Sequence, residues 1–177
     1  MTRHVPWRLL SLLGLGLVAA GGGFFTVKAI GRSKMRDVMR AAFKRYSLPA
    51  NWGPALSEKE SGSDSAALNM TGADAKRGGA WGATQITMLT ARAFGYSGPM
   101  ERLRTDPEFA AEMTAQMVKT GFAERGGTIY RYGPPASIEA MAAVWNAGRK
   151  LDDPNLPSVV VTKYIPALKK ALSEVAV

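Results

Sequence analysis

The carboxylates are the residues of this chain best suited to acid–base chemistry, because the other catalytic options are few. The sequence contains no cysteine and a single histidine, His4. This composition excludes thiol nucleophiles, disulfide frameworks, thiolate metal sites and almost every histidine-based catalytic scheme. Any catalysis must therefore come from carboxyl, hydroxyl or amide groups. We expect neither a metal nor an organic cofactor.

Glu60 differs from the other carboxylates in its position. For most of the 14 acidic residues, a position on a solvated helix face or next to a basic residue is a sufficient structural reason for the charge. Glu124 beside Arg125 is an example. Glu60 instead ends an apolar stretch that contains Trp52 and Leu56, and it directly precedes a loop. Burial against apolar residues disfavours the charged carboxylate, which keeps a glutamate protonated for general-acid work. The alternative for an isolated glutamate is a capping or salt-bridging role.

Two further motifs follow the pair Glu60-Ser61 along the chain. One reads G-A-T-Q-I over residues 82–86, and the other reads W-N-A-G over residues 145–148. With these three ordered motifs, the chain resembles the superfamily of soluble lytic transglycosylases and goose-type lysozymes over about residues 46–170. In that family a Glu-Ser pair ends a helix, a Gly-x-x-Gln-Ile segment follows, and an aromatic-Asn-Ala-Gly motif lies on a later helix.

The resemblance implies a role for each residue that matches a motif. The family's catalytic acid falls on Glu60. Trp145 stands where the family usually has tyrosine, and Ala83-Thr84 stands where it usually has Leu-Met. The positions that bind substrate along the sugar-binding groove fall on Ser61, Gln85, Trp145 and Asn146. They also include Tyr164, because residues 162–165, T-K-Y-I, resemble the Thr-x-x-Tyr motif near the family's last helix, with a spacing one residue shorter.

The resemblance further implies cleavage of the β-1,4 bond between N-acetylmuramic acid and N-acetylglucosamine in peptidoglycan. In a lytic transglycosylase one carboxyl group, here Glu60, protonates the leaving oxygen and then deprotonates the C6 hydroxyl, which attacks C1 and leaves a 1,6-anhydro end. Ordinary glycoside hydrolysis uses a second carboxylate. Thr87 stands where goose-type lysozymes carry an acid, which favours transglycosylation, and Asp74 is the remaining candidate for a second acid.

Two alternatives stay open beside the transglycosylase. One is a goose-type lysozyme that hydrolyses the same bond. The other is a membrane-tethered module that binds peptidoglycan without cutting it, since fold analogy alone does not establish activity. The products of digested peptidoglycan distinguish the three.

Helical patterns surround the motifs. Basic and apolar residues alternate at helical spacing over residues 32–46, and this face fits either the core of the domain or anionic headgroups. We expect two further helices to begin at Asp106-Pro107 and at Ser137, and the second of these to end at Gly148. The last helix is expected to begin at Pro157-Ser158. Strand-like alternation is confined to residues 128–132, too short to build a sheet, and residues 61–82 read as a long functional loop. We expect a mainly α, α+β lysozyme-like domain over residues 31–177.

The first 30 residues form a separate segment. The uncharged stretch from Leu9 to Val27 has the length of a helix that just spans a hydrocarbon core of roughly 30 Å. Its flanks, with Arg3 and Arg8 before it and small residues around Ala20, fit either a membrane anchor or a cleaved signal peptide. We expect an anchor over residues 9–27.

Charge and substrate together predict where the domain acts. The formal net charge of +9 favours anionic partners such as a cell-wall polymer or lipid. Nucleic acid is not expected, because the aromatic residues do not interleave with the basic ones as a stacking platform requires. The positive-inside rule would place the domain in the cytoplasm, but peptidoglycan lies outside the membrane. We therefore expect a domain facing the periplasm or cell exterior, with virion or secretion-machine proteins as candidate partners.

Overall fold

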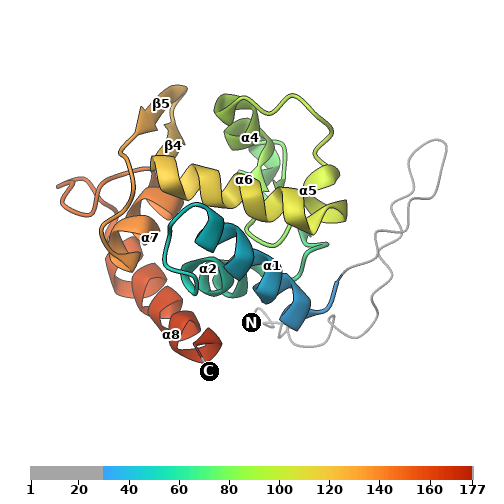
Figure 1. The fold of residues 1–177 in the computed structure, drawn as a ribbon. Coiled ribbons are helices and arrows are strands. Elements are labelled where there is room, and N and C mark those ends of the chain that lie inside the picture. The colour runs from blue at the N-terminus through green and yellow to red at the C-terminus, as the bar shows by residue number, and fades with distance from the viewer. Residues whose placement is uncertain (1–29, 177) are drawn as a thin grey trace, which may run out of the picture.

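Helices make up most of the structure, a computed structural model that describes residues 30–176 (Figure 1). The mainly α expectation is confirmed. In Figure 1 α6 crosses the middle of the molecule, with α4 above it and α1 and α2 below it. In chain order the elements are α1 (Arg32–Arg45), α2 (Trp52–Ser61), β1 (Leu68–Asn69), α3 (Gly72–Lys76), β2 (Ala80–Trp81), β3 (Ile86–Thr87), α4 (Met88–Phe94), α5 (Arg102–Thr105), α6 (Pro107–Thr120), β4 (Phe122–Arg125), β5 (Thr128–Arg131), α7 (Ile138–Ala147), the π-helical segment η2 (Val160–Tyr164) and α8 (Ile165–Val175).

Helix α1 is the amphipathic helix expected after the N-terminal segment. Met35, Met39 and Phe43 repeat at helical spacing on one face and are fully buried, whereas Lys34 and Lys44 are exposed. The buried face packs against α2 and α6. Of the two interpretations that the sequence left open, the apolar face therefore belongs to the main core.

Helices α1 and α8 hold α2 between them. Leu56 on α2 and Leu168 on α8 are both fully buried in the main core. Gly53 lets α2 approach α1 closely, because a Cβ atom at this position would lie only 2.5 Å from the ring of Phe43. The end of α2, which carries Glu60, is thus fixed by packing from two helices.

The helix boundaries follow from capping residues that the sequence displays. The Asp106 carboxylate accepts a hydrogen bond from the backbone N–H of Phe109 at 3.0 Å, and Pro107 occupies the first turn of α6. Ser137 caps α7 in the same way, and Gly148 ends it in the left-handed conformation, with φ +63°. The helix starts predicted at these residues are confirmed.

The structure contains two small sheets that the sequence pattern did not predict. Strands β1, β2 and β3 form an antiparallel sheet within and just after the segment expected to be a loop, and that segment also contains α3. The prediction that residues 128–132 are too short to build a sheet was wrong, because β5 pairs with β4 in a hairpin closed by Gly126 and Gly127. The strands of the three-stranded sheet have two residues each, too few to display an alternating pattern, whereas β5 coincides with the one segment of alternation in the sequence.

A second, smaller core lies on the other face of α6. It joins the small sheet and α4 to α6 and β4, and it is separate from the main core between α1, α2, α7 and α8. Its buried members are Ile86, Ala91, Met100, Leu103, Ala110, Met113, Met117 and Phe122.

The predicted membrane anchor over residues 9–27 lies outside the described residues. Among residues 30–176, no helix is both long and apolar enough to cross a membrane.

Candidate active site

The carboxyl group of Glu60 is held by the hydroxyl of Tyr164. The phenol donates a hydrogen bond to Glu60 Oε1 across a sequence separation of 104 residues. Glu60 lies one residue before the end of α2, and Tyr164 is the last residue of η2, where the π-helical turn meets α8. Lys59 places its ammonium group 4.5 Å from the centre of the Tyr164 ring. Two distant segments thus meet at a single acidic group.

Burial raises the pKa of Glu60 above the usual range of a glutamate. The hydrogen bond from Tyr164 and the charge of Lys59 oppose this rise, whereas the nearby carboxylate of Asp74 adds to it. Burial and the Glu60 carboxyl likewise raise the pKa of Tyr164 well above 10.0, so this phenol keeps its proton and acts as a donor. A glutamate with a raised pKa retains a proton to deliver closer to neutral pH.

Glu58, two residues earlier on the same helix, has the opposite environment. Burial would raise its pKa, but hydrogen bonds from Arg36 and Ser63 and the charge of Arg36 lower it overall. Its carboxylate forms an ion pair with Arg36 at 2.9 Å. The surroundings of the two carboxyl groups on this helix therefore shift their pKa values in opposite directions. Glu58 is a charged structural group, and Glu60 is a candidate acid.

Glu60 opens onto a cavity of about 360 Å³ between the small sheet, the β4–β5 hairpin and the end of α7. Of the residues proposed from the sequence, Glu60, Asp74, Gln85, Trp145 and Asn146 all line this cavity. Ser61 and Tyr164 do not line it. The residues proposed from the sequence therefore reach the cavity from four separate parts of the chain, as in a binding site formed by tertiary structure.

The turn over residues 82–85 forms one wall of this cavity. Gln85 has φ +54°, a left-handed conformation that is uncommon for a residue with a side chain and that recurs at functional sites. Its amide N–H donates to the backbone oxygen of Gly82 at 2.9 Å, which leaves the amide oxygen for a ligand. Gly82 is required here, because a Cβ atom would lie 2.3 Å from the backbone oxygen of Leu103.

Ser61 positions this turn. Its hydroxyl donates to the backbone oxygen of Ala83 at 2.8 Å and accepts the backbone N–H of Asp64 at 3.0 Å. These bonds tie the end of α2 to the turn that carries Gln85. The structure therefore places Ser61 behind the cavity wall.

The last turn of α7 supplies the opposite wall. Trp145 packs against both hydrophobic cores, and Asn146 beside it is exposed. Because α7 ends at Gly148, the Asn146 amide stands at the rim of the cavity, where a polar ligand could reach it.

Asp74 is held on α3 at the edge of the cavity. Its Oδ2 atom accepts a hydrogen bond from the Asn69 side chain at 2.7 Å. It is half-buried and close enough to Glu60 to raise the pKa of that group. The structure thus brings the candidate second acid into the same cavity as the first.

Glu124 is a cavity residue that the sequence analysis missed. Its place beside Arg125 in the sequence predicts a solvated pair, but its side chain is only 3% exposed and its carboxylate pairs with Arg77 at 2.7 Å. Arg77 also donates to Thr90 at 3.0 Å, and Glu124 accepts the backbone N–H of Gly127 at 2.9 Å. The pair joins the small-sheet side of the cavity to the hairpin. No local signal could have found it, because Arg77 and Glu124 lie 47 residues apart.

The part of the chain that the structure describes contains no cluster of three or more histidine, cysteine, aspartate or glutamate side chains placed to hold a metal ion. The chemistry that this arrangement offers is proton transfer by Glu60. Amide and aromatic groups around it are suited to hold a sugar or a similarly hydroxylated ligand.

Comparison of the chain with protein-family models, with curated proteins and with solved structures found no match.

Proposed function

We propose that this protein is a peptidoglycan lytic transglycosylase with a lysozyme-like domain. The observation that carries the proposal is one protonatable carboxyl group, Glu60, which lies half-buried at the end of a helix and is held by a tyrosine hydroxyl at the edge of a polar cavity. The resemblance of the three sequence motifs supplies the substrate class. Glu60, Gln85, Trp145 and Asn146, which those motifs contribute, all line that cavity.

The first step in this proposal is protonation of the leaving group. Tyr164 donates to Oε1 of Glu60, so the acidic proton is carried on the other carboxyl oxygen and is available to the glycosidic oxygen. As the bond between C1 of N-acetylmuramic acid and that oxygen breaks, the proton passes to the leaving sugar. The sugar's own acetamide stabilises the positive charge at C1, and the phenol stabilises the new carboxylate.

The second step returns the proton. The Glu60 carboxylate accepts the proton of the C6 hydroxyl, whose oxygen bonds to C1 and closes the 1,6-anhydro ring. Atoms and charge balance without water, and Glu60 ends the cycle protonated as it began. No second base is needed, and the carboxylate of Glu124 is already engaged by Arg77 and by the N–H of Gly127.

A goose-type lysozyme is the second candidate, and Asp74 is the observation that favours it. Asp74 lines the cavity of Glu60 and has a free carboxyl edge beyond its bond to Asn69. A hydrolase would use this carboxylate to activate a water molecule on the far side of the sugar ring. Under the transglycosylase proposal Asp74 moves no proton, so Asp74→Asn retains most activity and 1,6-anhydro ends. A loss of about a hundredfold, the scale of deleting a general base, would favour the hydrolase.

The deciding experiment is digestion of purified peptidoglycan followed by mass spectrometry of the products. We expect 1,6-anhydro ends from the wild-type protein, whereas reducing ends would identify a hydrolase. Glu60→Gln should lower turnover by at least about a hundredfold, because an amide keeps the shape of the side chain and cannot donate the proton. Glu58→Gln is the matched control on the same helix and should remain active. Binding without any product from the wild-type protein would support the non-catalytic module.

The proposed substrate also predicts a location. We propose that residues 9–27 anchor the protein in a membrane, with the domain facing the periplasm or cell exterior, where virion or secretion-machine proteins would be its partners. Full-length protein should then remain with membranes after carbonate extraction, whereas residues 31–177 alone should be released. Recovery of only a shortened chain that starts near Gly21 would indicate a cleaved signal peptide.

A further inference from the structure

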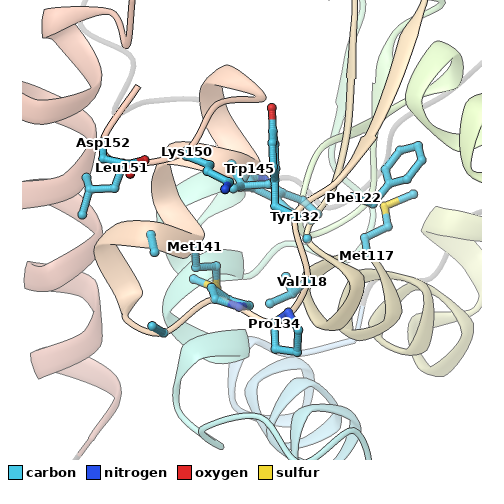
Figure 2. Close-up of a pocket in the computed structure, with 16 residues that line it drawn as sticks. Met117, Val118, Phe122, Tyr132, Pro134, Met141, Trp145, Lys150, Leu151 and Asp152 are labelled. Carbon is cyan, nitrogen blue, oxygen red and sulfur yellow. The ribbon is translucent and has the colours of Figure 1, made fainter. Parts of the chain in front are cut away.

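A second, larger cavity of about 510 Å³ adjoins the one at Glu60 (Figure 2). The two cavities share four lining residues, among them Trp145 and Phe122, so they are direct neighbours. Trp145 lies at this boundary, on the last turn of α7. A polymer bound at Glu60 therefore has a neighbouring space into which a substituent can extend.

The walls of the second cavity are apolar and stiff. Met141, Val118 and Pro134 lie together on one side of it (Figure 2). The loop that carries Pro134 is fixed at its start, because the N–H of Gly133 donates to the backbone oxygen of Thr120 at 3.0 Å. Two consecutive prolines at 134 and 135 limit the loop further. A ligand would thus find a largely pre-formed space, which lowers the entropy cost of binding.

Charged groups lie at the rim of this apolar space. Lys150 is exposed, and its ammonium group lies 5.9 Å from the centre of the Tyr132 ring. In Figure 2 it lies beside Tyr132 and Trp145, whereas Asp152 and Leu151 lie at the other end of the same loop. The cavity therefore offers apolar walls with one cation beside Trp145 and one carboxylate farther along the loop.

A row of aromatic and basic side chains connects the two cavities along the hairpin. Arg125, which lines the first cavity, lies 4.7 Å from the ring of Tyr130 and donates to its hydroxyl at 3.0 Å. Tyr130 stacks on Tyr132 with ring centres 5.6 Å apart, and Lys150 follows over Tyr132. Two cations thus flank a stacked tyrosine pair. Arg125 is already paired with Asp153 at 4.0 Å, so Lys150 is the cation that favours an anionic ligand in the second cavity.

We propose that the second cavity binds the peptide that peptidoglycan carries on the lactyl group of muramic acid. The inference rests on the proposed function, since it assumes that the glycan occupies the cavity at Glu60. This peptide combines small apolar side chains with free carboxylates, which match the apolar walls and the cation Lys150. Where the peptide contains a diamino acid, its amine would match Asp152. A bare glycan lacks both the methyl groups and the charges that this cavity complements.

Binding measurements on the inactive Glu60→Gln protein test the proposal directly. The ligands are peptide-bearing glycan oligomers and the same oligomers after an amidase has removed the peptides, titrated by calorimetry. We expect the peptide-bearing form to bind about tenfold more tightly, and Lys150→Glu to reduce this ratio to about twofold. Lys150→Gln should give an intermediate ratio. Lys44→Glu changes an exposed lysine that lines neither cavity, and it should leave the ratio unchanged.

The outcomes separate this inference from the function on which it rests. Equal binding of the two ligands, or a preference that Lys150→Glu leaves intact, would overturn the peptide site while the glycan site stands. If the Glu60→Gln protein binds neither oligomer and the wild-type protein cuts neither, the proposed function fails and the peptide site fails with it.

Discussion

Removal of the Tyr164 hydroxyl is the sharpest test of the chemistry assigned to Glu60. Tyr164→Phe deletes one oxygen atom and keeps the ring, which is 7% exposed and packs in the main core. The change leaves the ring packing and the cation–π contact with Lys59 in place. It removes only the hydrogen bond to Glu60.

The size of the effect follows from the charge that Glu60 gains as it gives up its proton. A hydrogen bond to a charged group contributes about 1.5–3 kcal/mol, and each 1.36 kcal/mol in a barrier is tenfold in rate. We therefore expect turnover to fall by roughly ten- to a hundredfold.

The pH dependence should change in a defined direction. A general acid is active below its pKa and loses activity as the pH rises through it. The bond from Tyr164 lowers the pKa of Glu60, so its removal raises that pKa and moves the alkaline limb of the activity profile to higher pH. A merely structural loss would lower activity without moving this limb.

The assay is release of anhydro products from peptidoglycan between about pH 5 and pH 9. Tyr96→Phe is the matched control, because its hydroxyl bonds to the backbone oxygen of Pro99 on an exposed loop outside the cavity. A Tyr164→Phe protein with turnover within twofold of wild type and an unmoved alkaline limb would refute the role given to the phenol.

Three further predictions concern stability. Because burial raises the pKa of Glu60, the folded state loses stability as the pH rises from the usual glutamate range through that pKa, so Glu60→Gln should raise the melting temperature at about pH 8 by a few degrees and leave it unchanged near pH 4, as calorimetry can check. Arg77→Met leaves Glu124, 3% exposed, without its cation and should cost about 3 kcal/mol in urea unfolding; a cost below about 1 kcal/mol would show that the pair contributes little. Leu168→Ala, at a fully buried site, should cost about 2–5 kcal/mol in the same assay, and a smaller loss would indicate that the core there can collapse.

Several helix boundaries and the buried face of α1 could be predicted from the sequence, because the residues that specify each of them lie within a few positions of one another. Asp106 and Ser137 mark the starts of α6 and α7 as caps, and Gly148 marks an end. The buried face of α1 follows from residues three and four apart. The position of Glu60 at the end of an apolar helix is a local signal too, but its assignment as the candidate acid rests on the resemblance of the three motifs.

The tertiary structure decided which residues meet. Tyr164 reaches Glu60 from 104 residues away, and Ser61 turned out to hold the turn behind the cavity wall. The three-stranded sheet has strands of two residues, whose pairing depends on neighbours far along the chain rather than on any alternating pattern.

Glu124 shows the physical reason most clearly. In the sequence its nearest base is Arg125, which suggests a solvated pair, but in the structure it is buried and its partner is Arg77. Burial and charge pairing are properties of the folded surroundings, which composition and spacing do not encode locally. The sequence by itself therefore determined the longer helices and pointed to the candidate acid, whereas only the fold determined the short helices, the pKa of that acid, the ion pair beside it and the second cavity.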